Sequence, residues 1–329
     1  MVVTRRDALA GAFAIAAAPA LSAVPARAAV PPANKQAPSF YRYKVGDIEV
    51  AVVSDGANTF PLPDKLVVNA TKEQVGDALQ KAFLPRDKMT IHFAPLAINT
   101  GGKLVVIDTG NGPGANAASK GAVGQFQTNL KAAGIDPKDV DIVVISHFHG
   151  DHVNGLLTAD NQLAFPNAEV LVPATEWKYW MDDGEMSRAP AGRMQDLFKN
   201  NRRVFEAGLQ KKVTPYEWGK DIAPGLLAVE TIGHTPGHTS YVLSSGSDKV
   251  FIQSDVTNHP DLFVKNPGWH LGFDQDGDKA ESTRRKVYDM LVAERLKVQG
   301  FHYPFPALGN IEKDGAGYRL VPAPWSPVI

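Results

Sequence analysis

The segment 147–152 has the sequence His-Phe-His-Gly-Asp-His and places three imidazoles and a carboxylate within six residues. It directly follows a β-branched run at 142–146, which predicts a fully buried strand. Alternate side chains of an extended segment share one side, so His147 and His149 are expected to face together. So many groups that are costly to bury indicate a metal site. Ordinary loop histidines are the alternative.

Further candidate ligands follow strands that are expected later in the chain. His234 and His238 lie in the segment Gly-His-Thr-Pro-Gly-His, Asp255 ends one apolar run, and His302 ends another. Site residues of α/β folds gather at strand ends. Asp255 alone could equally be a helix cap. The recurrence of such residues after several strands therefore predicts one joint site.

The elements that must position these residues come in two batches of strands, each mixed with helices. Strands are expected at 41–45, 48–54, 91–99, 104–108, 142–146, 170–172, 226–232, 240–244, 250–254, 298–301 and 318–321. Helices are expected at 71–83, 123–133 and 280–296, with a broken helical stretch at 175–206. This order predicts an α/β or α+β domain, and two batches of strands fit two packed sheets covered by helices.

Composition narrows the chemistry of the site. The chain has 329 residues, 44% of them hydrophobic, with a formal net charge of −1 and no cysteine. The charge balance does not indicate nucleic-acid binding. Without thiolates, a metal site must use imidazole and carboxylate ligands, which suit Zn²⁺ and also Mn²⁺, Co²⁺ or Fe²⁺.

The N-terminus has the pattern of a twin-arginine export signal. Arg5 and Arg6 precede a mild apolar stretch, and Ala26-Arg27-Ala28 matches a cleavage site. An anchored helix is the alternative, but the apolar stretch is shorter than the ~20 residues that span a bilayer. We expect a periplasmic or secreted protein with no stable membrane anchor after cleavage. The expected organisation is a signal peptide at 1–28, an irregular leader at 29–39 and one catalytic domain at 40–329.

The order of these motifs resembles the metallo-β-lactamase superfamily: the His-x-His-x-Asp-His segment, then Gly-His-Thr-Pro-Gly-His, a strand-ending Asp and a late His. The resemblance extends from about residue 41 to the C-terminus and is strongest to the secreted methyl parathion hydrolase-like and lactonase branch. Segments shared with that branch lie at 41–56, 106–110 and 302–319. The resemblance implies an α+β fold, the four-layer αββα sandwich, with two divalent metal ions.

The resemblance also implies roles for single residues. The first ion would be held by His147, His149 and His234, the second by Asp151, His152 and His302, and Asp255 would bridge the two. His238 would lie behind the site as a buried, hydrogen-bonded ring. Asp108 would orient the ligand loop, since imidazole ligands need a partner on their other nitrogen. A plain turn residue is the alternative for Asp108.

Two such ions can share a hydroxide, because metal binding lowers the pKa of water towards ~7. The hydroxide would attack a carbonyl carbon or a phosphoryl phosphorus. Asp151 and Asp255 would act in catalysis by holding the ions, and either could also shuttle a proton. A small neutral ester-like substrate is expected. The sequence does not indicate an oligomeric state.

Aromatic side chains in irregular stretches are candidates for the walls of a substrate pocket, although each could equally belong to the core. Trp180 is the best candidate, because it lies in the insertion with which the branch lines its site. Asn258 stands where quorum-quenching lactonases carry a tyrosine, three residues after the bridging Asp. The expected pocket residues are Trp177, Trp180, Phe198, Asn258, Phe263 and Trp269.

The function that fits best is hydrolysis of lactones or aryl esters, with phosphotriesters as a related substrate class. A β-lactamase is an alternative, but a bridging Asp255 argues against it. A glyoxalase II-like thioesterase is another, although the periplasm is a poor place for glutathione thioesters. A nuclease would need a basic surface. A scaffold that has lost catalysis is disfavoured, because all seven ligand positions are filled.

Replacement of both Arg5 and Arg6 by Lys should trap the precursor in the cytoplasm, because the twin-arginine route recognises the guanidinium pair. The wild-type chain should be exported and should begin at Ala29. Cell fractionation and N-terminal sequencing measure both outcomes. Normal export of the double variant would rule out this route.

Overall fold

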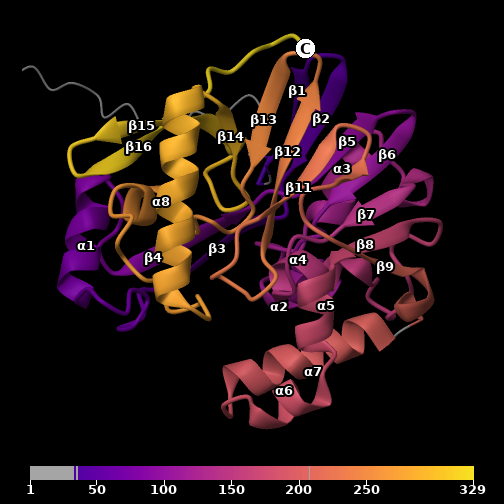
Figure 1. Cartoon of the computed structure of the whole chain (residues 1–329), viewed down its shortest axis with the longest axis horizontal. Coiled ribbons are helices and arrows are strands. Elements are labelled where there is room, and N and C mark those ends of the chain that lie inside the picture. The colour runs from indigo at the N-terminus through magenta and orange to yellow at the C-terminus, as the bar shows by residue number, and fades with distance from the viewer. Residues whose placement is uncertain (1–32, 35, 207) are drawn as a thin grey trace, which may run out of the picture. The chain divides into compact units, whose positions relative to one another are not determined.

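Runs of β-branched and aromatic residues form two seven-stranded sheets (Figure 1). The first sheet has the order β1-β2-β5-β6-β7-β8-β9. Its strands are β1 (Phe40–Val45), β2 (Ile48–Val53), β5 (Leu96–Thr100), β6 (Lys103–Ile107), β7 (Ile142–Val144), β8 (Glu169–Pro173) and β9 (Val213–Tyr216). The second sheet runs in chain order through β10 (Asp221–Ala223), β11 (Leu226–Glu230), β12 (Thr239–Ser245), β13 (Asp248–Ile252), β14 (Lys297–Gln299), β15 (Leu308–Asp314) and β16 (Gly317–Pro322).

The computed structural model describes residues 33–34, 36–206 and 208–329. The expected signal peptide at 1–28 and part of the expected leader lie outside the described residues. All elements named here belong to one compact unit, Pro38–Ile329. Among the described residues, no helix has the length and apolar character needed to cross a membrane.

Strands of the first sheet bury both faces, which places that sheet between two apolar layers. Val50 and Val52 of β2 pack in the core that the two sheets share, whereas Ala51 and Val53 pack on the opposite face. Helices α3 (Phe126–Ala132), α5 (Ala174–Trp180) and α7 (Arg193–Glu206) contribute to the layer on that opposite face, and α8 (Gly277–Glu294) packs against the second sheet. The predicted four-layer αββα sandwich is confirmed.

The remaining helical segments are short, apart from α1 (Lys72–Lys81), which begins at a capping box formed by Thr71 and Gln74. They are α2 (Gly112–Ala118), α4 (Gly150–Val153), α6 (Asp183–Arg188), η1 (Pro137–Asp139), η2 (Asn154–Leu156), η3 (Leu209–Lys212) and the π-helix η4 (Pro260–Val264). The expected break of the stretch 175–206 is confirmed, because α6 ends before Pro190 and α7 begins after Gly192.

The strand expected at 91–99 is wrong as a single element. It is divided into β4 (Lys88–Phe93) and β5, with Pro95 between them. β4 pairs with β3 (Gly56–Pro61) in a separate two-stranded sheet, and β5 joins the first sheet. Proline has no N–H to donate to a ladder, so the chain changes sheets at that point.

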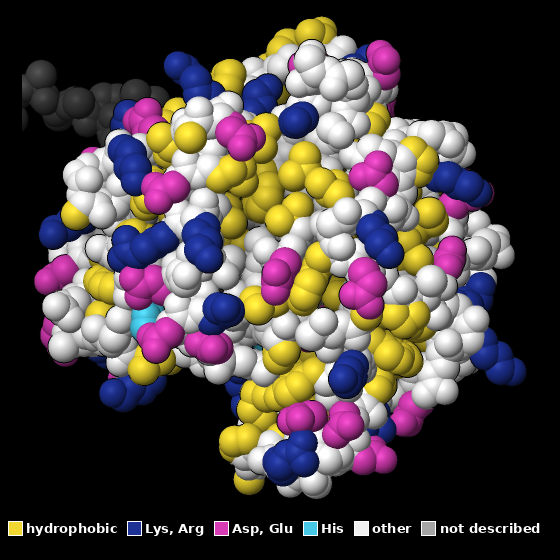
Figure 2. All heavy atoms as spheres, in the orientation of Figure 1, with side chains coloured by type: hydrophobic (Ala, Val, Ile, Leu, Met, Phe, Trp, Pro, Cys, Tyr) yellow, Lys and Arg dark blue, Asp and Glu magenta, His cyan; other side chains and the backbone are white. Residues whose placement is uncertain are grey.

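The surface shown in Figure 2 mixes acidic and basic side chains, and apolar side chains are exposed beside α8. Val229, Phe251 and Met290 line a shallow groove there.

Strand ends from both sheets meet at one edge and bring the candidate residues together. β6, β7 and β8 are parallel, so the loops after β6 and β7, which carry Asp108 and His147, leave the same edge of the first sheet. From the second sheet, β13 leads to Asp255 and the parallel strand β14 leads to His302. The site therefore lies where the two sheets face each other.

Gly155→Ala should destabilise the fold by about 1–3 kcal/mol, because a Cβ at this position would lie 1.9 Å from the carbonyl oxygen of Thr109. The control is Gly114→Ala in α2, where a Cβ would meet nothing within 4 Å and alanine favours the helix. Urea unfolding measures both variants. Equal stability of Gly155→Ala and Gly114→Ala would contradict this packing.

Candidate metal centre

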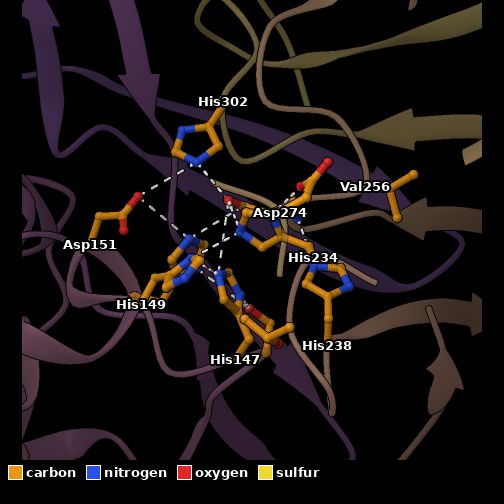
Figure 3. Close-up of polar contacts among 12 residues, drawn as sticks. His147, His149, Asp151, His234, His238, Val256, Asp274 and His302 are labelled. Atoms are coloured by element: carbon orange, nitrogen blue, oxygen red, sulfur yellow. Dashed lines mark hydrogen bonds and ion pairs between the residues drawn. The ribbon is translucent and has the colours of Figure 1, made fainter. Parts of the chain in front are cut away.

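Seven side chains converge in two sets that share one carboxylate. The first set is His147, His149, His234 and Asp255, and the second set is Asp151, His152, Asp255 and His302. The candidate ligand atoms of each set lie within 4.8 Å of one another, and all seven residues except Asp151 are buried. Figure 3 shows the rings pointing toward a common centre. The structure therefore brings together every residue that the sequence assigned to metal binding.

Acceptor atoms in this cluster face one another at short range. His234 Nε2 lies 2.9 Å from His149 Nδ1, and His302 Nε2 lies 2.9 Å from Asp255 Oδ2. His152 Nε2 and Asp255 Oδ1 are 3.2 Å apart, and neither atom has a hydrogen-bond partner. Bare lone pairs repel at these distances unless protons or cations lie between them. The donor set therefore fits divalent cations.

The far nitrogen of three rings is fixed by a hydrogen bond. His152 Nδ1 donates to Asp108 Oδ2 (2.8 Å) and His234 Nδ1 donates to Asp274 Oδ1 (2.7 Å). His302 Nδ1 donates to a backbone carbonyl, the oxygen of His92 (2.8 Å). Each bond orients its ring and leaves Nε2 facing Asp255, as metal-binding imidazoles require.

Asp108 orients the ring of His152, as the resemblance to the superfamily implied. Its carboxylate also accepts from the backbone N–H and from the hydroxyl of Ser146, at 2.8 Å each. Asp274 has the same relation to His234, and it pairs with the buried Arg284 at 3.4 Å. Asp274 was not predicted from the sequence, because an acidic loop before α8 resembles an ordinary solvated turn.

His238 belongs to neither set, and Figure 3 shows its ring beside the cluster. Its Nδ1 donates to the Thr231 carbonyl oxygen (2.9 Å), and its Nε2 accepts the backbone N–H of Asp255 (2.9 Å). Burial lowers the pKa of His238 to about 3, so the ring is neutral. His238 therefore supports Asp255 from behind, where the sequence placed it.

Burial and the neighbouring carboxylates shift the pKa values of the clustered residues in different directions. Burial lowers the pKa of His147 and His149 well below the usual range, so both rings are neutral and available as ligands. Burial would also lower the pKa of His234, but Asp255 and Asp274 outweigh it and raise that pKa to about 9. Burial would raise the pKa of Asp255, yet His302 and His152 hold it well below the usual range.

A cavity of about 260 Å³ opens onto both sets. Three amide side chains and a group of apolar side chains form its walls. They are Asn58, Asn111, Asn258, Phe60, Ile91, Phe93, Leu197 and Phe273, together with Arg193. Asn258 is buried and its Oδ1 has no hydrogen-bond partner. Of the expected pocket residues, Asn258 alone lines this cavity.

The other five expected pocket residues are corrected by the structure. Trp180 and Phe198 are fully buried in the apolar layer on the outer face of the first sheet, and Trp177 packs against the same layer. Phe263 is fully buried in a separate cluster, and Trp269 packs beside it. Helices α5 and α7 bury Trp177, Trp180 and Phe198 against the outer face of the first sheet, so these three rings do not reach the cavity.

Two further polar residues near the ligands, Arg193 and Glu176, were not predicted from the sequence. Arg193 begins α7, and its Nη2 lies 3.5 Å from His149 Nε2 while its guanidinium lies 4.8 Å from the centre of the Phe273 ring. Glu176 is fully buried in α5, and burial raises its pKa to about 7. Neither residue stands in a motif, and both approach the site only through the packing of the insertion.

His234→Ala should remove one metal ion and most of the activity, because His234 Nε2 faces Asp255 and His149. His238→Ala should keep the metal content near wild type and cost about 1–3 kcal/mol of stability, because it leaves the N–H of Asp255 without its acceptor. Metal analysis and thermal unfolding of both purified variants decide the matter. Loss of metal from His238→Ala alone would reverse the assignment.

Comparison with known proteins gives curated relatives that match about half of the chain. An N-acyl homoserine lactonase from Bacillus sp. is 26% identical over 168 residues, which cover 50% of this chain and 57% of that protein. The anti-Pycsar protein Apyc1 of Paenibacillus sp. strain J14 is 28% identical over 148 residues, covering 41% and 54%. The chain thus spans little more than half the length of these curated relatives.

Solved structures extend the likeness over the whole fold. The hydrolase AbOPH of the β-lactamase superfamily is 27% identical with a TM-score of 0.80, covering 89% of this chain and 100% of that one. AidC, a dizinc quorum-quenching lactonase, is 23% identical with a TM-score of 0.80, covering 87% and 98%. Residues 96–293 match the metallo-beta-lactamase superfamily. The chain belongs to the metallo-beta-lactamase superfamily.

Proposed function

We propose that this protein is a dinuclear metal-dependent hydrolase that cleaves lactone or aryl ester bonds, with phosphotriesters as a related substrate class. The observation that carries the proposal is the pair of ligand sets that share Asp255 at the floor of one cavity. The similarity to N-acyl homoserine lactonases and to the hydrolase AbOPH supports it.

Two divalent ions held here would supply a hydroxide near neutral pH and would polarise the oxygen of the scissile bond. Zn²⁺ suits the imidazole and carboxylate donors best, and Mn²⁺, Co²⁺ or Fe²⁺ would also fit. Within the chain, Asp255 contributes to both sets and His238 holds its backbone from behind. Asp151 lines the cavity with a side chain that is 23% exposed. It is the carboxylate best placed to accept a proton from the attacking water.

The walls of the cavity favour a small, largely apolar ester. Phe60, Phe93 and Phe273 offer aromatic surface, while the Asn258 amide offers a buried oxygen, Oδ1, without a hydrogen-bond partner. Among the described lining residues, no tyrosine, lysine or cysteine could protonate a departing alkoxide. A leaving oxygen of low basicity, such as a phenolate, needs no such acid. Aryl esters and aryl lactones are therefore the proposed preferred substrates.

Turnover should fall steeply as the leaving alcohol becomes more basic. The test measures kcat/KM for a series of substituted phenyl acetates, dihydrocoumarin, an aliphatic lactone, a paraoxon-type triester and nitrocefin. We expect the phenolic substrates to exceed the aliphatic lactone by at least about 10²-fold, the contribution typical of a missing general acid.

Asp255→Asn is the control, and it should abolish turnover of every substrate, because a neutral amide replaces the shared carboxylate. Preferred hydrolysis of nitrocefin, or equal rates for phenolic and aliphatic leaving groups, would contradict the proposed substrate class.

A further inference from the structure

Glu176 connects the two chain segments that carry the histidines of the first set. Its Oε1 accepts a hydrogen bond from the backbone N–H of Phe148 (3.3 Å) and another from the hydroxyl of Thr235. Phe148 lies between His147 and His149, and Thr235 directly follows His234. One buried carboxylate oxygen therefore joins the neighbours of all three histidines in the first set.

The start of α5 also packs closely on the turn that contains His234. A Cβ added at Gly237 would lie 2.4 Å from the backbone nitrogen of Glu176. Little freedom remains between helix and turn, so displacement of the Glu176 side chain would be transmitted to His234.

All groups around the carboxylate are donors. Trp180 Nε1 donates to Oε2 at 3.0 Å, and the Phe148 N–H and the Thr235 hydroxyl donate to Oε1. None of the ion pairs among the described residues includes Glu176. An acceptor-only carboxylate matches this environment, whereas an amide would direct its NH₂ group at a donor.

The second set is held by different partners. His152 is oriented by Asp108, and His302 by the carbonyl oxygen of His92. The hydrogen bonds of Glu176 reach neither of these residues. Asp108 contacts His152 directly and reaches His147 only through the hydroxyl of Ser146, whereas Glu176 supports the first set alone.

We propose that Glu176 is a positioning residue for the first metal ion: it holds His147, His149 and His234 in register by joining Phe148 to Thr235. This inference rests on the proposed dinuclear site. Glu176 should therefore determine the affinity for the first ion, whereas Asp108 supports the ligands of the second ion.

The experiment titrates metal-free protein with Co²⁺ alone and follows visible absorption and calorimetry. Glu176→Gln should weaken one of the two ions by about 10–100-fold, as loss of a partner behind a ligand does, and should leave the other within a few-fold of wild type. Asp108→Asn should weaken the opposite ion. The two ions are identified with His147→Ala and His302→Ala, which each remove a ligand of one set.

Trp180→Phe is the matched control, because it removes a bond to Oε2 and keeps both bonds that join the ligand segments. It should lower thermal stability and leave both affinities unchanged. Thr235→Val removes one of the joining bonds and should weaken the first ion, less than Glu176→Gln does. This variant keeps the test decisive should Glu176→Gln fail to fold.

Wild-type affinity for both ions in Thr235→Val or Glu176→Gln would overturn the inference. Equal weakening of the first ion by Trp180→Phe would do the same, since it would reduce Glu176 to a general stabiliser. Wild-type protein that binds fewer than two ions would instead overturn the proposed function itself.

Discussion

The structure depends on the burial of facing acceptor atoms between two sheets. Imidazole nitrogens and carboxylate oxygens approach to about 3 Å around Asp255, and they lie in an interior from which water is largely excluded. Burial of such a cluster is costly unless each atom has a partner of opposite character. The protein supplies partners for the outer atoms, and cations would supply them for the inner ones.

This constraint links the site to the packing of the two sheets. Each set takes residues from both: His147 and His152 follow the first sheet, while His234, Asp255 and His302 follow the second. Neither sheet alone assembles a complete set. Metal binding is therefore coupled to the packing of the sandwich, and bound ions should contribute to its stability. The hydrogen bonds of Asp108, Asp274 and Glu176 hold the rings in place between the sheets.

Local patterns predicted the site better than its surroundings. The spacing of the histidines after an apolar strand predicted a metal site, and the resemblance to the superfamily supplied the seven convergent residues and the buried place of His238. Asp274, Glu176 and Arg193 could not be found this way, because each meets the site through a contact between segments far apart in the chain. Trp180 shows the opposite error, because its position in an insertion suggested a pocket wall. Its ring instead packs against Phe198 in the core and donates a hydrogen bond to Glu176. The fold was predictable as two batches of strands, whereas the change of sheet at Pro95 depends on pairing that only the tertiary structure decides.

Anomalous diffraction from crystals of the metal-loaded protein, recorded on both sides of the metal absorption edge, tests the central claim most directly. Two peaks are predicted, one among His147, His149 and His234 and the other among Asp151, His152 and His302, with Asp255 between them. A single peak at full metal loading, or peaks away from these residues, would contradict the account.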